Sequence, residues 1–449
     1  MRFWIDLHGC AKNQVDAEEI CARLEAAGHE YVPGPDGADL ILVNTCGFIE
    51  DAKRESIEAV MSLRAAHPGK RILVAGCLAQ RYATELGEGM PEADGILGNA
   101  DLGAVVEACE RTLAGERSVT APPAPARRSP ARRSRLFDFP GTAHVKITEG
   151  CSNRCSYCAI PLIRGPLSSR PTEEVAAECA ELVRPVSEGG KGIRELVLVG
   201  QDLGSYGRDL GPQLLPELLG RLARLDGDFR VRVMYVHPDH FPEAILPIMA
   251  AEPRIVPYLD IPFQHASPRI LAAMNRSGSG EAYLRLIDRI RSFLPDAALR
   301  STFLLGFPGE TDADFAELRA FQERAGLDWL GAFAYSREEG TPAGDMRGRP
   351  AAKAVAARKA EVEEAQERIT RGRLERFVGR EIEVLVEEAV EPAGGPEGDE
   401  EELCIGRAWN QAPEVDGLTV LRGRREPGTV ARSRVLSVAG VDLDAAPLG

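Results

Sequence analysis

The sequence predicts an α/β protein in three parts: a doubly wound parallel sheet, a partial (β/α)6 barrel of the TIM type, and a small all-β module. Short apolar strands alternate with amphipathic helices from the first residues onward, and this alternation is typical of parallel sheets. After a proline-rich stretch the alternation resumes for six further units, which predicts an incomplete barrel. The C-terminal residues instead contain short strand patterns separated by turns.

The N-terminal domain is expected to span residues 1–117. Each of its first three strands leads into a helical pattern, and each is followed closely by a cysteine. In open α/β sheets, ligands bind at the carboxyl ends of the strands. Cys10, Cys46 and Cys77 are therefore expected to converge on one point at this edge of the sheet. The three strands are expected at residues 3–7, 40–43 and 71–74.

A linker is expected at residues 118–140, where proline, alanine, serine and arginine dominate and apolar residues are few. Such a composition is typical of a solvated spacer between domains. The arginines leave a second interpretation open, in which this segment contacts RNA.

Residues 141–373 are expected to form the barrel. Helical patterns such as residues 173–183, 214–225 and 281–293 separate its strands. The active site of such a barrel lies at the mouth formed by the C-terminal ends of the strands. A long helix with charges of both signs is expected at about residues 351–377, and its composition predicts that it is largely exposed. The six strands are expected at residues 143–147, 195–199, 230–236, 258–261, 299–305 and 329–335.

Residues 374–449 form the third predicted unit, a small all-β barrel. Three strand patterns separated by turns are present, as is typical of small β domains. The segment contains sixteen acidic and eight basic residues. The strands are expected at residues 381–386, 418–421 and 433–438.

Composition narrows the functional classes. The net charge of -15 argues against a protein that coats nucleic acid through its charge, and an acidic surface suits basic partners better. The sequence has no long apolar run and no signal-peptide pattern at its start, so we expect no membrane contact and a cytoplasmic location. In that reducing compartment, clusters among the ten cysteines indicate metal binding or catalysis rather than disulfides.

The strongest chemical signal is a loop that contains Cys151, Cys155 and Cys158, separated by three and then two residues, directly after the first barrel strand. A cubane [4Fe–4S] cluster is usually held by four thiolates. Three ligands therefore leave one iron open, and an open metal position is typical of a catalytic site. A zinc site would add a fourth cysteine or histidine nearby, and none follows in this loop.

This spacing on a partial barrel resembles the radical S-adenosylmethionine superfamily. The resemblance implies that the open iron binds the amino and carboxylate groups of S-adenosylmethionine and that reduction of the cluster yields a 5′-deoxyadenosyl radical. It implies no catalytic acid or base, because an unactivated C–H bond does not yield to such groups and the cofactor supplies the chemistry. Four residues resemble the cofactor contacts of the family: Tyr157, Gln201, Gln264 and Glu310.

The N-terminal domain resembles that of the methylthiotransferases within this superfamily, and the resemblance rests on the sequence around each of its three cysteines. It implies that Cys10, Cys46 and Cys77 hold a second [4Fe–4S] cluster, whose open iron carries the sulfur that is transferred. The C-terminal module resembles a TRAM domain. The resemblance therefore covers almost the whole chain apart from the linker.

Two classes of methylthiotransferase remain. The RimO type modifies the β-carbon of an aspartate in the twelfth protein of the small ribosomal subunit, and the MiaB type modifies a tRNA adenosine next to the anticodon. Lys12 stands in a segment that differs from the usual one of the tRNA-modifying enzymes. The RimO type is therefore favoured, with tRNA as the less favoured substrate. Further segments that resemble the RimO type are residues 158–171, 260–267, 335–342 and 406–417.

Charge gives a separate argument for the same choice. The acidic C-terminal module, with an acidic run at residues 397–402, should repel tRNA and attract a basic ribosomal protein. A solvated acidic loop without a partner is the alternative. An electron donor such as flavodoxin or ferredoxin is also expected. Two other classes stay open, a cluster- or zinc-dependent RNA-binding module without catalysis and a sulfur carrier for cluster assembly.

Overall fold

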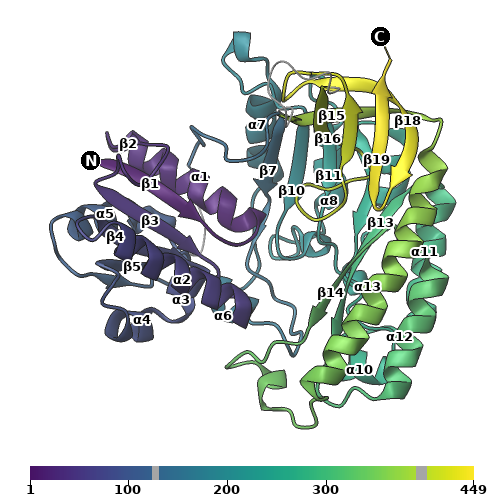
Figure 1. Cartoon of the computed structure of the whole chain (residues 1–449), viewed down its shortest axis with the longest axis horizontal. Helices are drawn as coiled ribbons and strands as arrows, with labels where there is room; N and C mark the ends of the chain where they lie inside the picture. Colours follow the sequence, from purple (N-terminus) through teal and green to yellow (C-terminus); the bar gives the residue numbers. More distant parts are fainter. Residues whose placement is uncertain (124–130, 391–401, 449) are drawn as a thin grey trace.

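The computed structural model describes residues 1–123, 131–390 and 402–448. The chain forms an N-terminal sheet covered by helices, a central curved sheet with helices outside it, and a small C-terminal barrel (Figure 1). The predicted α/β class and the order of the three units are therefore confirmed. Within the described ranges, no helix is both long enough and apolar enough to cross a membrane.

The N-terminal sheet has six parallel strands in the order β2-β1-β3-β4-β5-β6. Its central strands β3 and β4 are buried almost throughout, because helices cover both faces of the sheet. The three strands that the sequence predicts are β1, β3 and β4, whereas the other three are short. The strands are β1 (Arg2–Leu7), β2 (Glu30–Tyr31), β3 (Leu40–Thr45), β4 (Arg71–Gly76), β5 (Gly95–Gly98) and β6 (Val119–Thr120).

Successive side chains of β3 point into two separate cores. Leu40 and Leu42 pack under α1 and α5, whereas Ile41 and Val43 pack under α2, α3 and α4. Helices on both faces leave the carboxyl ends of the strands free for a site. The helices are α1 (Ala11–Ala26), α2 (Glu50–Ala66), α3 (Cys77–Arg81), α4 (Ala83–Gly89) and α5 (Val105–Leu113), with a 3₁₀ turn at Leu102–Ala104.

The described residues of the expected linker pack against the N-terminal and central domains. Its first residues form β6 and extend the N-terminal sheet. Arg133 is buried and pairs with Glu18 at 2.5 Å and with Glu178 at 2.7 Å, so its guanidinium is not free for RNA. The expectation of a solvated spacer is therefore wrong at Arg133. Arg127 and Arg128 lie outside the described residues.

The central sheet has six parallel strands in the order β14-β13-β12-β11-β10-β7. Its edge strands β7 and β14 are not paired with one another in the described chain, so the barrel is open, as the sequence predicts. β12 begins at Ile255, before the predicted position, and Pro257 lies inside it where the pairing with β11 shifts register. Proline is disfavoured inside a strand, so the sequence predicts a start only after it. The strands are β7 (Thr142–Lys146), β10 (Glu195–Val199), β11 (Arg230–Val233), β12 (Ile255–Asp260), β13 (Ala298–Leu305) and β14 (Trp329–Ala334).

Helices cover the outer face of the central sheet. The long helix α13 (Ala352–Leu374) packs against β14 and α12, and it buries a stripe that includes Val355, Val362 and Ile369. Its other faces are exposed, as expected, but this stripe covers the open edge of the sheet. The other helices are α6 (Ile160–Arg164), α7 (Thr172–Val183), α8 (Leu215–Leu222), α9 (Ile245–Ala251), α10 (Pro268–Ala273), α11 (Gly280–Phe293) and α12 (Asp312–Ala325).

Short elements complete the central domain and lie mostly in the loops between strands and helices. An antiparallel pair is formed by β8 (Thr148–Glu149) and β9 (Ser168–Ser169). The 3₁₀ turns lie at Val186–Glu188, Leu203–Ser205, Pro238–His240, Pro342–Asp345 and Glu375–Phe377.

The C-terminal module is a closed five-stranded barrel in the order β15-β16-β17-β19-β18. Two of its strands, β16 and β19, have no counterpart in the sequence-based prediction. Of the acidic run at residues 397–402, only Glu402 lies within the described residues. The strands are β15 (Glu381–Val390), β16 (Leu403–Ala408), β17 (Thr419–Arg422), β18 (Val430–Ala439) and β19 (Asp442–Pro447).

The C-terminal barrel caps the N-terminal ends of the central strands. Arg407 Nη2 donates to the Thr142 hydroxyl at 3.1 Å, and the Trp329 indole donates to the Asn410 carbonyl at 2.7 Å. Thr142 and Trp329 are the first residues of β7 and β14. The module therefore lies at the end opposite the mouth, where the loops after the strands lie (Figure 1).

Candidate functional site

The three N-terminal cysteines lie at adjacent strand ends. Cys10 comes directly before α1, Cys46 directly after β3, and Cys77 is the first residue of α3 after β4. Because β1, β3 and β4 are neighbours in the sheet, the structure brings these three residues to one edge, at the carboxyl ends of the strands.

Gly76 permits the close approach of two of these strand ends. It has a φ of +99°, and a Cβ at this position would lie 2.4 Å from the Thr45 carbonyl oxygen and 2.6 Å from Asn44 Oδ1. Any side chain would push the end of β4 away from β3. Glycine at this position therefore keeps Cys46 and Cys77 together.

Asn13 connects the loops that contain the cysteines. Its Nδ2 donates to the carbonyl oxygens of His8 and Thr45, both at 3.0 Å, and its Oδ1 lies 3.3 Å from Cys77 Sγ. Asn44 Nδ2 in turn donates to the Asn13 carbonyl at 2.7 Å. Since Asn13 is fully buried, these bonds are shielded from water and fix the arrangement of the loops.

Arg164 joins the barrel domain to this cysteine set. It ends α6, which follows the loop of residues 151–158, and its side chain is almost fully buried. Its Nη2 donates to Cys77 Sγ at 3.2 Å, and the guanidinium pairs with Asp16 at 2.9 Å and with Glu149 at 2.8 Å. A buried cation needs such partners, and here one of them is a cysteine sulfur.

The electrostatic surroundings of the Cys46 and Cys10 thiols differ. Burial and the nearby Cys77 thiol raise the pKa of Cys46 to about 12. Burial also raises the pKa of Cys10, but the positive charges of Lys12 and Arg164 outweigh burial and lower this pKa overall. Cys10 is accessible to solvent, although enough protein surrounds it for burial to matter. A lowered pKa favours the thiolate, which is the form that binds iron.

The second cysteine set lies in the loop between β8 and α6, supported by the C-terminal end of α10. Ser156 donates from its amide to the Met274 carbonyl at 2.9 Å and from its hydroxyl to the Ala273 carbonyl at 2.8 Å. Burial raises the pKa of Cys151 to about 11 and that of Cys158 to about 12, and the Cys155 thiol adds to both increases. The structure therefore brings these three thiols together as well.

Two cationic or polar side chains lie next to Cys155. Arg276 Nη1 is 3.9 Å from Cys155 Sγ and donates to the Tyr157 hydroxyl at 3.1 Å. His237 Nε2 is 3.8 Å from the same sulfur, and burial lowers its pKa to about 2. Arg276 thus fixes the Tyr157 side chain within the cysteine loop, and His237 stays neutral beside Cys155.

Gln201 presents an unpaired acceptor near this loop. It follows β10, and its Nε2 donates to Glu149 Oε1 at 3.2 Å. Its Oε1 is buried and has no hydrogen-bond donor among the described residues. Such an orphaned acceptor is costly unless a donor from a ligand reaches it, and an ammonium group would satisfy it.

Gln264 and Glu310 differ in their surroundings. Gln264 follows β12 with a φ of +68°, which is uncommon outside glycine and is found most often at functional sites. Glu310 Oε2 accepts from the Gly306 amide at 2.7 Å, and its Oε1 accepts from Arg358 Nη1 at 2.6 Å. Both oxygens of Glu310 therefore already have partners within the chain.

The donor sets suit clusters better than single ions. In the part of the chain that the structure describes, no three side chains of His, Cys, Asp and Glu are placed to hold one metal ion. A cubane cluster does not require such a point, because each thiolate binds a different iron. Two sets of three thiols, one with the Arg164 guanidinium at 3.2 Å from a sulfur, fit that requirement.

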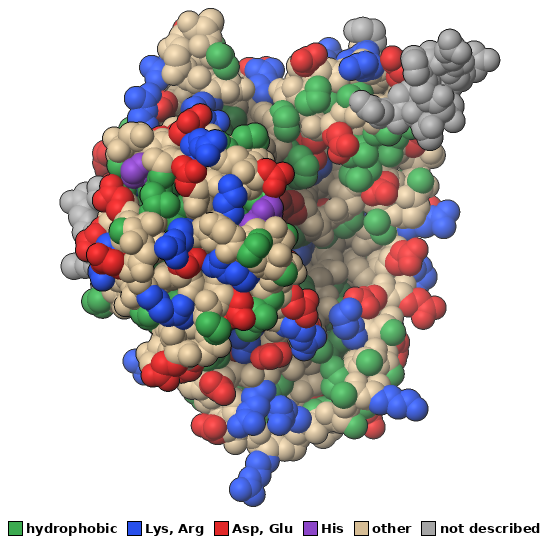
Figure 2. Space-filling view, turned by 60° about the vertical axis from the view of Figure 1, so that its left-hand side comes forward, with side chains coloured by type: hydrophobic (Ala, Val, Ile, Leu, Met, Phe, Trp, Pro, Cys, Tyr) green, Lys and Arg blue, Asp and Glu red, His purple; other side chains and the backbone are tan. Residues whose placement is uncertain are grey.

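Ion pairs join the N-terminal domain to the barrel beside the cysteines. Glu338, in the loop after β14, pairs with Arg81 at 2.5 Å and with Lys53 at 3.2 Å, and its carboxylate is almost fully buried. Lys12 Nζ reaches the Gly200 carbonyl at 3.4 Å. The surface is hollowed between the two domains, and charged side chains of both signs border the hollow (Figure 2).

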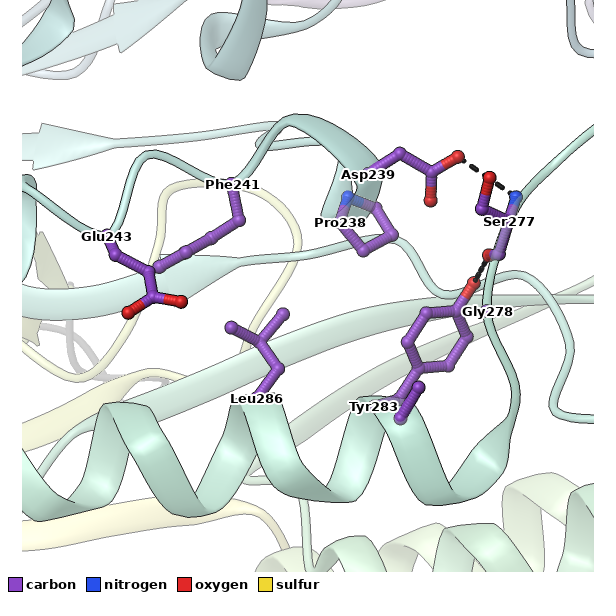
Figure 3. A pocket seen from close by; sticks show the side chains of 9 residues that line it. Pro238, Asp239, Phe241, Glu243, Ser277, Gly278, Tyr283 and Leu286 are labelled. Carbon is purple, nitrogen blue, oxygen red and sulfur yellow. Dashed lines mark hydrogen bonds between the residues drawn. The ribbon is translucent and has the colours of Figure 1, made fainter.

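A separate cavity of about 260 Å³ lies between the Pro238–His240 turn and the first turns of α11. Figure 3 shows the Ser277 amide donating to Asp239 and the Tyr283 hydroxyl donating to the Ser277 carbonyl at its wall. The cavity is lined by neither a cysteine nor a residue with a predicted cofactor role. It therefore lies beside the site rather than within it.

Sequence reasoning missed several residues that shape the site. Arg164 lies within a segment that resembles the RimO type, but nothing in the sequence indicates that it contacts Cys77. Arg276 and Glu338 carry no motif of their own. Their partners lie 121 and 257 residues away along the chain, so only the fold brings them together.

Known families match consecutive parts of the chain. The Uncharacterized protein family UPF0004 matches residues 2–98, the Radical SAM superfamily matches residues 145–321, and the TRAM domain matches residues 378–447. Among solved structures, the radical S-adenosylmethionine methyltransferase TsrM from Kitasatospora setae has a TM-score of 0.56 at 18% identity, over 76% of this chain and 75% of that one. This likeness shows a shared fold.

Sequence relatives narrow the family further. The chain is 42% identical to the ribosomal protein uS12 methylthiotransferase RimO of Treponema denticola, over 98% of this chain and 99% of that protein. It is 43% identical to the protein of the same name from Moorella thermoacetica, over 93% and 92% of the two chains. These matches confirm the choice of the RimO type over the MiaB type. The chain therefore belongs to the RimO family of radical S-adenosylmethionine methylthiotransferases.

Proposed function

We propose that this protein transfers a methylthio group to the β-carbon of an aspartate in ribosomal protein uS12, the twelfth protein of the small subunit. The observation that carries the proposal is the pairing of two three-cysteine sets across one domain boundary, with Arg164 in contact with Cys77 of one set and following the loop of the other. The names of the relatives supply the substrate.

Each cysteine set would hold one [4Fe–4S] cluster, through Cys10, Cys46 and Cys77 in the N-terminal domain and through Cys151, Cys155 and Cys158 in the barrel. S-adenosylmethionine at the barrel set would supply the radical chemistry of the superfamily. The orphaned Oε1 of Gln201 would accept from the methionyl amino group. Thiolate ligands and an open iron are the usual requirements for such a site.

The residues of the chain would bind and orient the cofactor and exclude water from it. Tyr157, held by Arg276, would border the cofactor at the cysteine loop, and Gln264 would contribute from the end of β12. Glu310 would act indirectly, since its carboxylate fixes the Gly306 amide and Arg358 and thereby the loop after β13. Glu338 would fix the position of one cysteine set relative to the other. This matters because small displacements between reacting groups cost large factors in rate.

The proposal includes an electron donor such as flavodoxin or ferredoxin, because a cluster of this kind receives single electrons, and a cytoplasmic location, where uS12 is made and assembled. The C-terminal barrel lies at the end of the strands opposite the mouth. Contacts of its described residues with uS12 would therefore lie at a distance from the reacting carbon rather than at the mouth.

The test compares reconstituted wild-type protein with one variant of each cysteine set. Wild-type protein should hold about eight iron atoms per chain, on the usual count for two cubanes, and should form methylthiolated uS12 by mass spectrometry. Cys46→Ala should lower the iron content by about half and keep 5′-deoxyadenosine formation. Cys155→Ala should abolish 5′-deoxyadenosine formation.

A matched control is Cys404→Ala, since Cys404 is buried in the C-terminal barrel and belongs to neither set. It should keep the full iron content and activity. Methylthiolated tRNA in place of uS12 in the wild-type reaction would contradict the substrate assignment. Unchanged iron content in Cys46→Ala would contradict the N-terminal cluster.

A further inference from the structure

Lys12 reaches from the N-terminal domain into the mouth of the barrel. It lies two positions after Cys10, in the first turn of α1, and is partly buried. Its Nζ donates to the Gly200 carbonyl at 3.4 Å and lies 4.2 Å from the centre of the Tyr235 ring. Gly200 and Tyr235 follow β10 and β11. The ammonium group therefore lies at the barrel strand ends, on the side of Cys10.

Lys12 has no carboxylate partner among the described residues. Within the described chain, its contacts are a carbonyl oxygen and an aromatic face, and no carboxylate lies within 4.0 Å. The carboxylates of this region are already used, since Asp16 and Glu149 each pair with both Lys146 and Arg164. The nearby negative charge is the thiolate of Cys10, which would be bound to iron in the proposed cluster. A partly buried cation without a carboxylate partner is unfavourable, so this position favours the arrival of a carboxylate.

Tyr235 holds this ammonium group in place. It has a φ of +58°, which is rare for a bulky side chain and is retained at functional sites where the surrounding structure imposes it. The face of its ring attracts the Lys12 cation through its π electrons. Because an aromatic face positions the ammonium without neutralising it, the charge stays available to a ligand.

We propose that Lys12 binds the side-chain carboxylate of the target aspartate and makes the enzyme specific for a carboxylate substrate. This inference rests on the proposed function. The target carbon is bonded directly to that carboxylate, so one ion pair would fix the carbon between the two cysteine sets. A neutral base such as adenine has no group that would neutralise Lys12, and leaving a buried group of the site unpaired is a strong source of discrimination.

A carboxylate can reach this position from two sources, the target aspartate and the methionyl group of S-adenosylmethionine. The test therefore measures binding of each. Full-length reconstituted enzyme, with Lys12 or Lys12→Met, is titrated with uS12 in which the target is aspartate or has been changed to asparagine. The target is identified from the wild-type product by mass spectrometry, and the titration contains S-adenosylmethionine but no reductant, so that no turnover occurs.

Wild-type enzyme should bind the aspartate form about tenfold or more tightly than the asparagine form, as expected for a desolvated charge pair. Lys12→Met should bind both forms with the weaker affinity, which is the signature of a direct pair in a double-mutant cycle. Lys12→Arg, which keeps the charge, should retain a preference for aspartate. Lys353→Met, at an exposed position of α13, should behave as wild type.

Iron content is measured for every variant, because loss of the Lys12 charge also acts on the Cys10 thiol, and affinities are compared at equal iron content. A preference for aspartate that survives in Lys12→Met overturns the inference. A loss of S-adenosylmethionine binding in Lys12→Met also overturns it, because the lysine would then serve the methionyl carboxylate. If wild-type enzyme does not modify uS12 at all, the proposed function itself is wrong. This outcome differs from the two results with Lys12→Met that overturn only the role of Lys12.

Discussion

Arg164 Nη2 donates a hydrogen bond to the sulfur of Cys77 at 3.2 Å, across the boundary between the barrel and the N-terminal domain. The same guanidinium pairs with Asp16 and Glu149, so its position is fixed from both domains. Hydrogen bonds and positive charge at a cluster sulfur stabilise the added electron and raise the reduction potential. Arg164 should therefore raise the reduction potential of the cluster that we propose Cys77 binds.

Changing Arg164 to Gln should lower the reduction potential of the proposed N-terminal cluster. The positive charge beside Cys77 is lost, and the expected change is about 60 mV or more, which is roughly tenfold for a one-electron couple. Redox titration followed by electron paramagnetic resonance measures it. Arg111→Gln, at an exposed position of α5, is the control, and an unchanged potential in Arg164→Gln would contradict the contact.

Changing Glu338 to Gln should uncouple radical formation from product formation. The carboxylate is almost fully buried between Arg81 and Lys53. Its loss leaves Arg81 without a carboxylate partner and leaves Lys53 paired with Glu50 alone, which lets the domains shift. Methylthio transfer should fall about tenfold to a hundredfold, whereas 5′-deoxyadenosine formation without substrate should persist.

Glu339→Gln is the matched control for this prediction, because Glu339 is the next residue and is exposed. It should leave the ratio of product to 5′-deoxyadenosine unchanged. Equal losses of both products in Glu338→Gln would mean that the variant damages the barrel site itself rather than the domain arrangement.

Local patterns in the sequence predict the strongly apolar strands of the two parallel sheets and miss several strands with weaker patterns. β3 and β4 are continuous apolar runs bounded by polar residues, so their burial is readable from composition. β5 is a four-residue strand with glycine at both ends, and β19 reads Asp-Leu-Asp-Ala-Ala-Pro. Neither is apolar enough to stand out, and each forms because a neighbouring strand supplies its hydrogen bonds.

The candidate site likewise has features that the sequence predicts and one that it does not. The spacing of Cys151, Cys155 and Cys158 predicts a shared function because all three lie in one loop. The convergence of Cys10, Cys46 and Cys77 follows from the parallel sheet, since neighbouring strand ends meet. The Arg164 contact with Cys77 spans 87 residues, and no local pattern encodes such a contact between domains.

Changing Glu195 to Gln should destabilise the junction between the central domain and the C-terminal barrel. Glu195 is fully buried and pairs with Arg230 at 3.1 Å, Arg232 at 2.8 Å and Arg407 at 2.9 Å. Removing its charge leaves three arginines without their shared anion, which should cost about 3–5 kcal/mol. Urea unfolding measures the change in the free energy of unfolding.

The control for Glu195→Gln is Glu383→Gln, at an exposed position of β15, which should change the free energy of unfolding by about 0.5 kcal/mol or less. A small effect in Glu195→Gln would mean that the three arginines find water or other partners once the anion is gone.

Asp416 should make the same junction more stable at lower pH. Burial raises its pKa from an ordinary value of 3.8 to about 6, against the opposing effects of Arg300 and of the hydrogen bond from Tyr258. Between these two values the folded protein binds a proton at Asp416 that the unfolded chain does not bind. Stability from this group is therefore fully present below about pH 4 and is lost as the pH rises towards 6.

The measurement is the free energy of unfolding of wild type minus that of Asp416→Asn, followed from pH 4 to pH 7. The difference should fall by roughly 2–3 kcal/mol between pH 4 and pH 6 and then stay level. Subtraction of the variant is needed because burial lowers the pKa of His265 to about 4, which makes stability rise with pH over much of this window. A difference that rises with pH would show that Arg300 and Tyr258 outweigh burial at Asp416.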